Sequence, residues 1–222
     1  MTRYFYDFEF IEGAHSLHPI SIGVAADDGR EFYRVFADAP WERVNKHPWL
    51  LEHVLPQLHR TDDNSKSSKI IACEVKSFLM LGRTPPELWA WYASHDHTCL
   101  TQLLGGIAGY PSLIPMWTND LRQWQHQLGV AEMPVQDRFV HNALGDALHN
   151  LTMWEFLDRQ ESRPRALHRS TLRTLRQRMS SLIVEPYYAG RKRGWCDGVR
   201  EVIRVIDNEI QITDKIEART VH

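Results

Sequence analysis

The sequence lacks the features that would place it in a membrane or outside the cell. Its three cysteines, Cys73, Cys99 and Cys196, lie far apart and form no Cys-x-x-Cys pair. Neither a disulfide framework nor a zinc–cysteine site is therefore indicated. No apolar run approaches the roughly 18 to 20 residues that a membrane span needs, and the N-terminus has no apolar core of a secretion signal. We expect a cytoplasmic protein with no membrane partner.

The charge balance changes along the 222 residues. Residues 1–158 hold 12 Lys and Arg against 20 Asp and Glu, whereas residues 159–204 hold 12 against 4. An acidic body with a basic arm suits a protein whose body holds metal ions and whose arm contacts a polyanion. The alternatives are a solvated basic helix, or an arm that packs on the body or joins two copies as a homodimer. Four arginines of the arm would share one helix face: Arg165, Arg169, Arg173 and Arg176.

The order of apolar patterns is that of an α/β protein. Three runs, Arg3–Ile11, Pro19–Ala26 and Arg30–Phe36, predict an antiparallel meander. Further expected elements are helices at 41–55, 69–81, 96–104, 119–128 and 142–158, a fourth strand at 87–93, a loop at 59–68, and tail helices at 167–184 and 195–216. This order favours an RNase H-like fold, a mixed sheet flanked by helices. We place that domain at residues 1–158 and a basic helical extension at 159–222.

Two carboxylates lie in the first predicted strand. Asp7 and Glu9 alternate with Phe8 and Phe10, so both acids would project from the same face. Paired carboxylates on an apolar strand are costly unless they bind a cation, and hard oxygen ligands suit Mg²⁺ or Mn²⁺. The alternative is an edge strand with a solvated acidic face.

Three further residues could complete such a site. Asp96 follows the fourth predicted strand at the start of a helix, where it could instead be a helix cap. His141 and Asp146 mark the start of the 142–158 helix, where each could also be an ordinary surface residue. Hydrolysis of a phosphodiester with two metal ions needs carboxylates that hold both ions, and it benefits from a base such as histidine.

With these residues together, the sequence resembles the DEDDh 3'–5' exonucleases. Asp7-x-Glu9 is similar to their first motif and His141-x-Ala143-x-x-Asp146 to their third, while Asp96 stands at the second. The opening YFYDFEFIE, the ISIGV strand and the DGRE turn are similar to a branch of small bacterial exoribonucleases described as polyadenylate-specific 3'-exoribonucleases. Phe10 stands where many other members have threonine. The resemblance covers about residues 1–158.

The resemblance implies a role for each residue. Asp7 would bridge two Mg²⁺ or Mn²⁺ ions, Glu9 and Asp146 would complete the shell of the first ion, and Asp96 would support the second. His141 would take the proton from the attacking water. Phe8 or Phe10 could stack on the terminal nucleotide, or pack in the core.

The function expected from the resemblance is a 3'–5' exoribonuclease that acts on single-stranded RNA 3' ends and releases nucleoside 5'-monophosphates. One alternative is a DNA-directed or mixed exonuclease. The other is an inactive RNase H-like module that binds nucleic acid through the basic arm. The complete acidic set argues against the inactive module, because a binding protein would gain from losing those repulsive charges.

Overall fold

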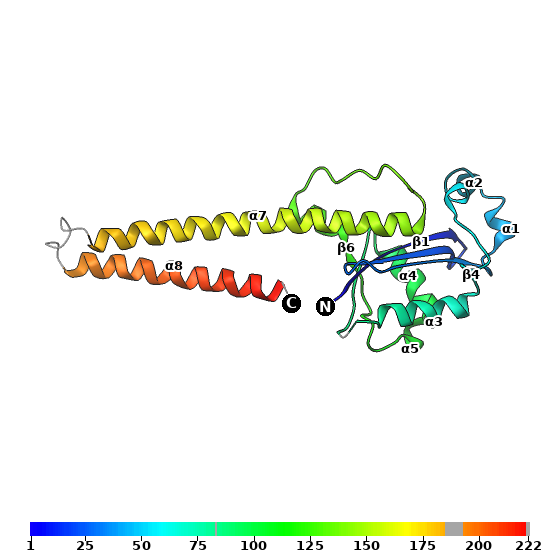
Figure 1. The fold of residues 1–222 in the computed structure, drawn as a ribbon, viewed down its shortest axis with the longest axis horizontal. Coiled ribbons are helices and arrows are strands. Elements are labelled where there is room, and N and C mark those ends of the chain that lie inside the picture. Colours follow the sequence, from blue (N-terminus) through cyan, green and yellow to red (C-terminus); the bar gives the residue numbers. More distant parts are fainter. Residues whose placement is uncertain (83, 185–192, 221–222) are drawn as a thin grey trace. The chain divides into compact units, whose positions relative to one another are not determined.

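A six-stranded mixed sheet forms the centre of the computed structural model, which describes residues 1–82, 84–184 and 193–220 (Figure 1). The strands are β1 (Arg3–Glu12), β2 (Leu17–Ala26), β3 (Glu31–Phe36), β4 (Ser65–Lys66), β5 (Glu87–Ala90) and β6 (Asn119–Asp120). Their order in the sheet is β4-β3-β2-β1-β5-β6. β1, β2 and β3 pair antiparallel, and the other neighbours pair parallel. The predicted meander and the predicted α/β fold class are confirmed.

The other regular elements are helical. They are α1 (Trp41–Val44), α2 (Pro48–His53), the 3₁₀ turn η1 (Leu55–Gln57), α3 (Ser68–Leu79), α4 (Ser94–Leu103), α5 (Gly106–Gly109), α6 (Leu121–Leu128), α7 (Ala143–Val184) and α8 (Arg193–Thr220). Figure 1 shows α3 and the first part of α7 on opposite sides of the sheet. Among the described residues, no helix combines the length and the hydropathy that a membrane crossing needs.

Three of the predicted elements were wrong in their bounds. The helix expected over 41–55 is broken, because Pro48 begins a new helix and His47 before it is extended at ψ 112°. The loop expected at 59–68 contains β4. The helix expected at 119–128 begins only at Leu121, because Asn119 and Asp120 form β6, and Asp120 is the N-cap that accepts a hydrogen bond from the amide of Gln123.

Alternation along β1 divides the core into two layers. The rings of Tyr4, Tyr6 and Phe8 lie in the apolar cluster that also contains residues of α3 and α4. The opposite face carries Phe5, which contacts Trp154 of α7 at 6.0 Å between ring centroids. Asp7 and Glu9 share this second face with Phe5, because successive side chains of a strand point in opposite directions. The two carboxylates therefore point toward the start of α7.

The chain divides into two compact units, Met1–Leu157 and Asp158–His222. The boundary falls within α7, which joins the two helices that the sequence predicted separately at 142–158 and 167–184 and continues through Pro164 between them. A proline removes one helical hydrogen bond, and the turns on either side carry this helix past it. In the second unit, Val199 and Ile206 of α8 are buried.

The arginines of the basic arm pair with acids inside this second unit. Arg169 and Arg173 of α7 lie 3.3 and 3.8 Å from Asp214 of α8, and Arg176 of α7 pairs with Asp207 of α8. These are three of the four arginines for which the sequence predicted a shared face, and the side chain of the fourth, Arg165, lies outside the described residues. Three arginines of this face thus pair with acids of α8, an arrangement that the sequence pattern did not indicate.

Candidate active site

The first two acidic residues occupy the middle of the sheet. Asp7 pairs with Gly23 and Glu9 with Ser21 in the register between β1 and β2. Glu9 is only 8% exposed. The pairing register shifts directly after Glu9, between Glu9 and Phe10. Such an irregularity bends a strand and redirects the side chains next to it.

Asp96 is turned toward β1 and does not cap its helix. It lies in the first turn of α4 and is 5% exposed. Its Oδ1 accepts a hydrogen bond of 2.8 Å from the backbone amide of Phe8, the residue between the two acids of β1. The N-cap position of α4 is Ala93, which makes no side-chain cap hydrogen bond. A long-range contact to β1 thus replaces the local capping role that the sequence left open.

Gly23 lets the start of α7 approach the sheet closely. A Cβ at this position would lie 2.2 Å from the backbone nitrogen of Leu144 and 2.3 Å from the carbonyl of Ala143. Only glycine fits such a contact. Further along α7, the buried Asn150 donates a hydrogen bond of 3.2 Å to the carbonyl oxygen of Tyr6. Together these contacts bring the first turn of α7, and Asp146 with it, next to the acids of β1.

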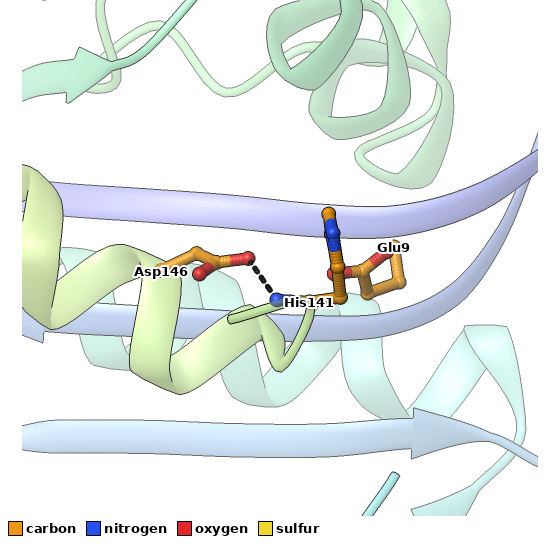
Figure 2. A group of neighbouring side chains, drawn as sticks. All are labelled: Glu9, His141 and Asp146. Carbon is orange, nitrogen blue, oxygen red and sulfur yellow. Dashed lines mark hydrogen bonds between the residues drawn. The ribbon is translucent and has the colours of Figure 1, made fainter. Parts of the chain in front are cut away.

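The turn before α7 carries His141 in a left-handed conformation, with φ at 62°. Its backbone amide donates to Oδ2 of Asp146 at 3.1 Å, and the side-chain amide of Gln136 donates to Oδ1 at 2.7 Å. Figure 2 shows His141 and Asp146 beside Glu9. One ligand atom from each of these three residues lies within 4.8 Å of the others.

The four carboxyl groups perturb one another. Burial raises the pKa of Asp7 well above its ordinary value, and the negative charges of Asp96, Glu9 and Asp146 raise it further. Burial followed by the charges of Asp146 and Asp96 raises the pKa of Glu9 to about 8. Burial also raises the pKa of Asp96 to about 7, although the hydrogen bond from the Phe8 amide lowers it. Burial raises that of Asp146, against the bond from Gln136. Four clustered acids, of which Glu9 and Asp96 are buried and the other two half-buried, are a donor set that a hard divalent cation satisfies.

One cavity opens onto these acids, and a second is lined by the end of β1 and by α1 and α2. The first, of about 620 Å³, is lined by Asp7, His141 and Asp146 together with Trp91 and Arg122. The other, of about 700 Å³, is lined by residues from β1 to α2 that include Phe10, Arg43, Lys46 and Trp49. Arg122 in the first cavity and Arg43 and Lys46 in the second are cations that a polyanion could contact.

The two candidate stacking residues differ in their environments. Phe8 is 3% exposed and contacts Tyr6 and Phe36 at 6.2 and 6.4 Å between ring centroids. Its ring therefore lies in the core, which is the alternative that the sequence left open, and a nucleotide cannot reach it. Phe10 is half-buried, lines the larger cavity and stacks on His95.

Sequence reasoning missed a group of side chains around His141. Trp49 and His53 of α2 contact the imidazole of His141, at 4.9 and 5.7 Å between ring centroids. No local pattern identifies them, because about 90 residues separate α2 from His141 and the contact exists only in the folded chain. Gln136 was missed for a similar reason, since it precedes the motif in a segment without regular structure.

The fold and site are those of a nuclease-type α/β domain with an acidic centre, and comparison with known proteins gives its family. Residues 2–157 match the family model described as the 3'-5' exoribonuclease Rv2179c-like domain. The chain belongs to this family. The 3'-5' exoribonuclease Rv2179c of Mycobacterium tuberculosis strain H37Rv and the 3'-5' exoribonuclease MT2234.1 of strain CDC 1551 are each 40% identical to it over 157 residues. These residues make up 70% of this chain and 92% of each relative, so the extension lies outside the similarity.

Proposed function

We propose that the protein is a metal-dependent 3'–5' exoribonuclease that releases nucleoside 5'-monophosphates from single-stranded RNA. The observation that carries the proposal is the convergence of Glu9, His141 and Asp146 within 4.8 Å, next to the buried Asp96 and the half-buried Asp7. Family membership supports the direction of hydrolysis and the choice of RNA, because the relatives are named 3'-5' exoribonucleases.

The residues of the site fit a pair of divalent ions. Asp7, Glu9, Asp96 and Asp146 supply hard oxygen ligands, and the charge of bound cations would offset the repulsion that raises their pKa values. When bound, Mg²⁺ or Mn²⁺ ions would lower the pKa of a coordinated water and stabilise charge on the phosphoryl oxygens. The role of the protein is to hold these carboxylates against their own repulsion, through the hydrogen bonds from Phe8 and Gln136.

His141 is the residue placed to accept a proton. Its imidazole lies beside Glu9 and Asp146, and its backbone amide is already bonded to Asp146. A general base must reach the proton that it removes, at about 2.6 to 3.2 Å between heavy atoms. Phe10 and Trp49 line the second cavity, and Trp49, which is 44% exposed, could stack on the terminal base.

Digestion of matched RNA and DNA oligonucleotides tests the proposal. With a 5' label and Mg²⁺ or Mn²⁺ present, we expect RNA to shorten one nucleotide at a time from its 3' end and the released products to be 5'-monophosphates. Asp7→Asn should be inactive, whereas Asp27→Asn, at an exposed position just after β2, should behave as the wild type. Preferential digestion of DNA would support the DNA-directed alternative, and binding without hydrolysis would support the inactive module.

A further inference from the structure

The imidazole of His141 is held by two aromatic side chains of α2. Trp49 and His53 are four residues apart and therefore lie on the same face of this short helix. The His53 ring stacks on the His141 ring with an interplanar angle of 19°. The Trp49 ring makes a T-shaped contact with the His141 ring, with an interplanar angle of 75°. Trp49 also contacts His53, at 4.9 Å between centroids. The three rings form a closed group (the α2 ring clamp: Trp49, His53 and His141).

A second contact joins the same two segments through the backbone. The side-chain amide of Asn142, directly after His141, donates a hydrogen bond of 2.7 Å to the carbonyl oxygen of Gln57 in η1. The segment from α2 to η1 thus contacts two consecutive residues of the turn before α7, His141 through its ring and Asn142 through its side-chain amide. This matters because His141 has a left-handed backbone, which a non-glycine residue keeps only where its surroundings impose it. The backbone amide of His141 is hydrogen-bonded to Asp146, and its ring contacts Trp49 and His53.

We propose that His53 is a positioning residue for His141, which directs the His141 imidazole toward Glu9 and Asp146. The inference rests on the proposed function, in which His141 accepts the proton of the attacking water. His53 is half-buried and stacks on the His141 ring, while a ring nitrogen of His141 lies within 4.8 Å of ligand atoms of Glu9 and Asp146. Trp49 is 44% exposed, so it is free to contact substrate as well.

The competing role for His53 is direct contact with a nucleotide, and steady-state kinetics separates the two. A group that only orients the base changes kcat and leaves KM unchanged, whereas a substrate contact changes KM. A displacement of about 1 Å in a catalytic group can lower the rate by up to about 10²-fold. We therefore expect His53→Ala to lower kcat by about 10- to 100-fold on a short RNA, with KM within about twofold of the wild type.

Two further variants keep the test independent of the stability of the alanine variant. His53→Phe retains a stacking ring without a titratable nitrogen and should recover most of kcat, whereas His53→Gln retains polar bulk without a ring and should not. His126→Ala, at an exposed position on α6, is the matched control and should leave both constants unchanged. A raised KM with unchanged kcat in His53→Ala, or equal kcat in the phenylalanine and glutamine variants, would overturn the proposal.

A spectroscopic measurement does not depend on activity. In protein with ¹³C-labelled histidine, the Cε1–H resonance of His141, assigned through His141→Asn, should shift in His53→Gln and return toward its wild-type position in His53→Phe. An unchanged resonance in every His53 variant would mean that the rings do not stack in solution. If the wild type shows this coupling but hydrolyses no RNA, the proposed function fails while the contact between the rings stands.

Discussion

Replacing Glu9 by glutamine should make the metal-free protein more stable at alkaline pH. Glu9 is 8% exposed and lies next to other acids, which together with burial raise its pKa to about 8. A carboxyl group whose pKa is higher in the folded state contributes stability that is present below its unfolded pKa and is lost as the pH rises through the folded pKa. The folded wild type therefore loses stability between about pH 4.5 and 8, because the unfolded chain releases this proton first.

The size of the effect follows from the same two values. At about 1.36 kcal/mol per pH unit, a pKa that moves from 4.5 in the unfolded chain to about 8 in the folded protein corresponds to about 5 kcal/mol. Part of this free energy is repulsion from Asp146 and Asp96, so removing the charge of Glu9 also changes the energies of those two groups. We therefore expect Glu9→Gln to exceed the wild type by about 2 to 5 kcal/mol at pH 9, and by much less at pH 5.

Urea unfolding in EDTA at pH 5 and pH 9 measures this difference. Tryptophan fluorescence is a suitable signal, because seven of the eight tryptophans precede residue 158 and report on the first unit. Glu12→Gln, at an exposed position on the same strand, is the control and should follow the wild type at both pH values. If Glu9→Gln has the same pH dependence as the wild type, Glu9 is not held among buried like charges and the electrostatic argument for a cation site fails.

The remaining predictions concern the metal, the base, the packing and the extension. Mg²⁺ or Mn²⁺ should raise the melting temperature of the wild type and not that of Asp146→Asn, since ions that bind the folded state stabilise it; equal shifts would place the ions elsewhere. His141→Ala should lower the single-turnover rate by about 10²- to 10⁴-fold, and an unchanged rate would remove it from the mechanism. Gly23→Ala should destabilise the protein by about 1 to 3 kcal/mol in urea unfolding, because its Cβ would overlap Leu144; wild-type stability would show that α7 can shift. Deleting residues 160–222 should leave a folded first unit whose RNA binding keeps the same salt dependence, because Arg169, Arg173 and Arg176 of the extension pair with acids of α8; a flatter slope would show that the arm contacts RNA.

The sequence alone determined the features that depend on local periodicity. A period of two along the first strand places Asp7 and Glu9 on one face, whatever the strand packs against. The spacing from His141 to Asp146 follows from a turn that leads into a helix. These features are set by neighbouring residues in the chain, so they can be recognised before the fold is known.

Only the tertiary structure decided which side chains meet. Phe8 and Phe10 lie on the same side of β1, so the strand pattern is the same for both, and only the packing around them makes Phe8 buried and leaves Phe10 half-buried. His53 reaches His141 because α2 and the turn before α7 fold against each other across a long separation in the chain. The pairing of Arg176 with Asp207 likewise arises where two helices pack side by side. Such contacts depend on packing between distant segments, which no periodicity within one segment records.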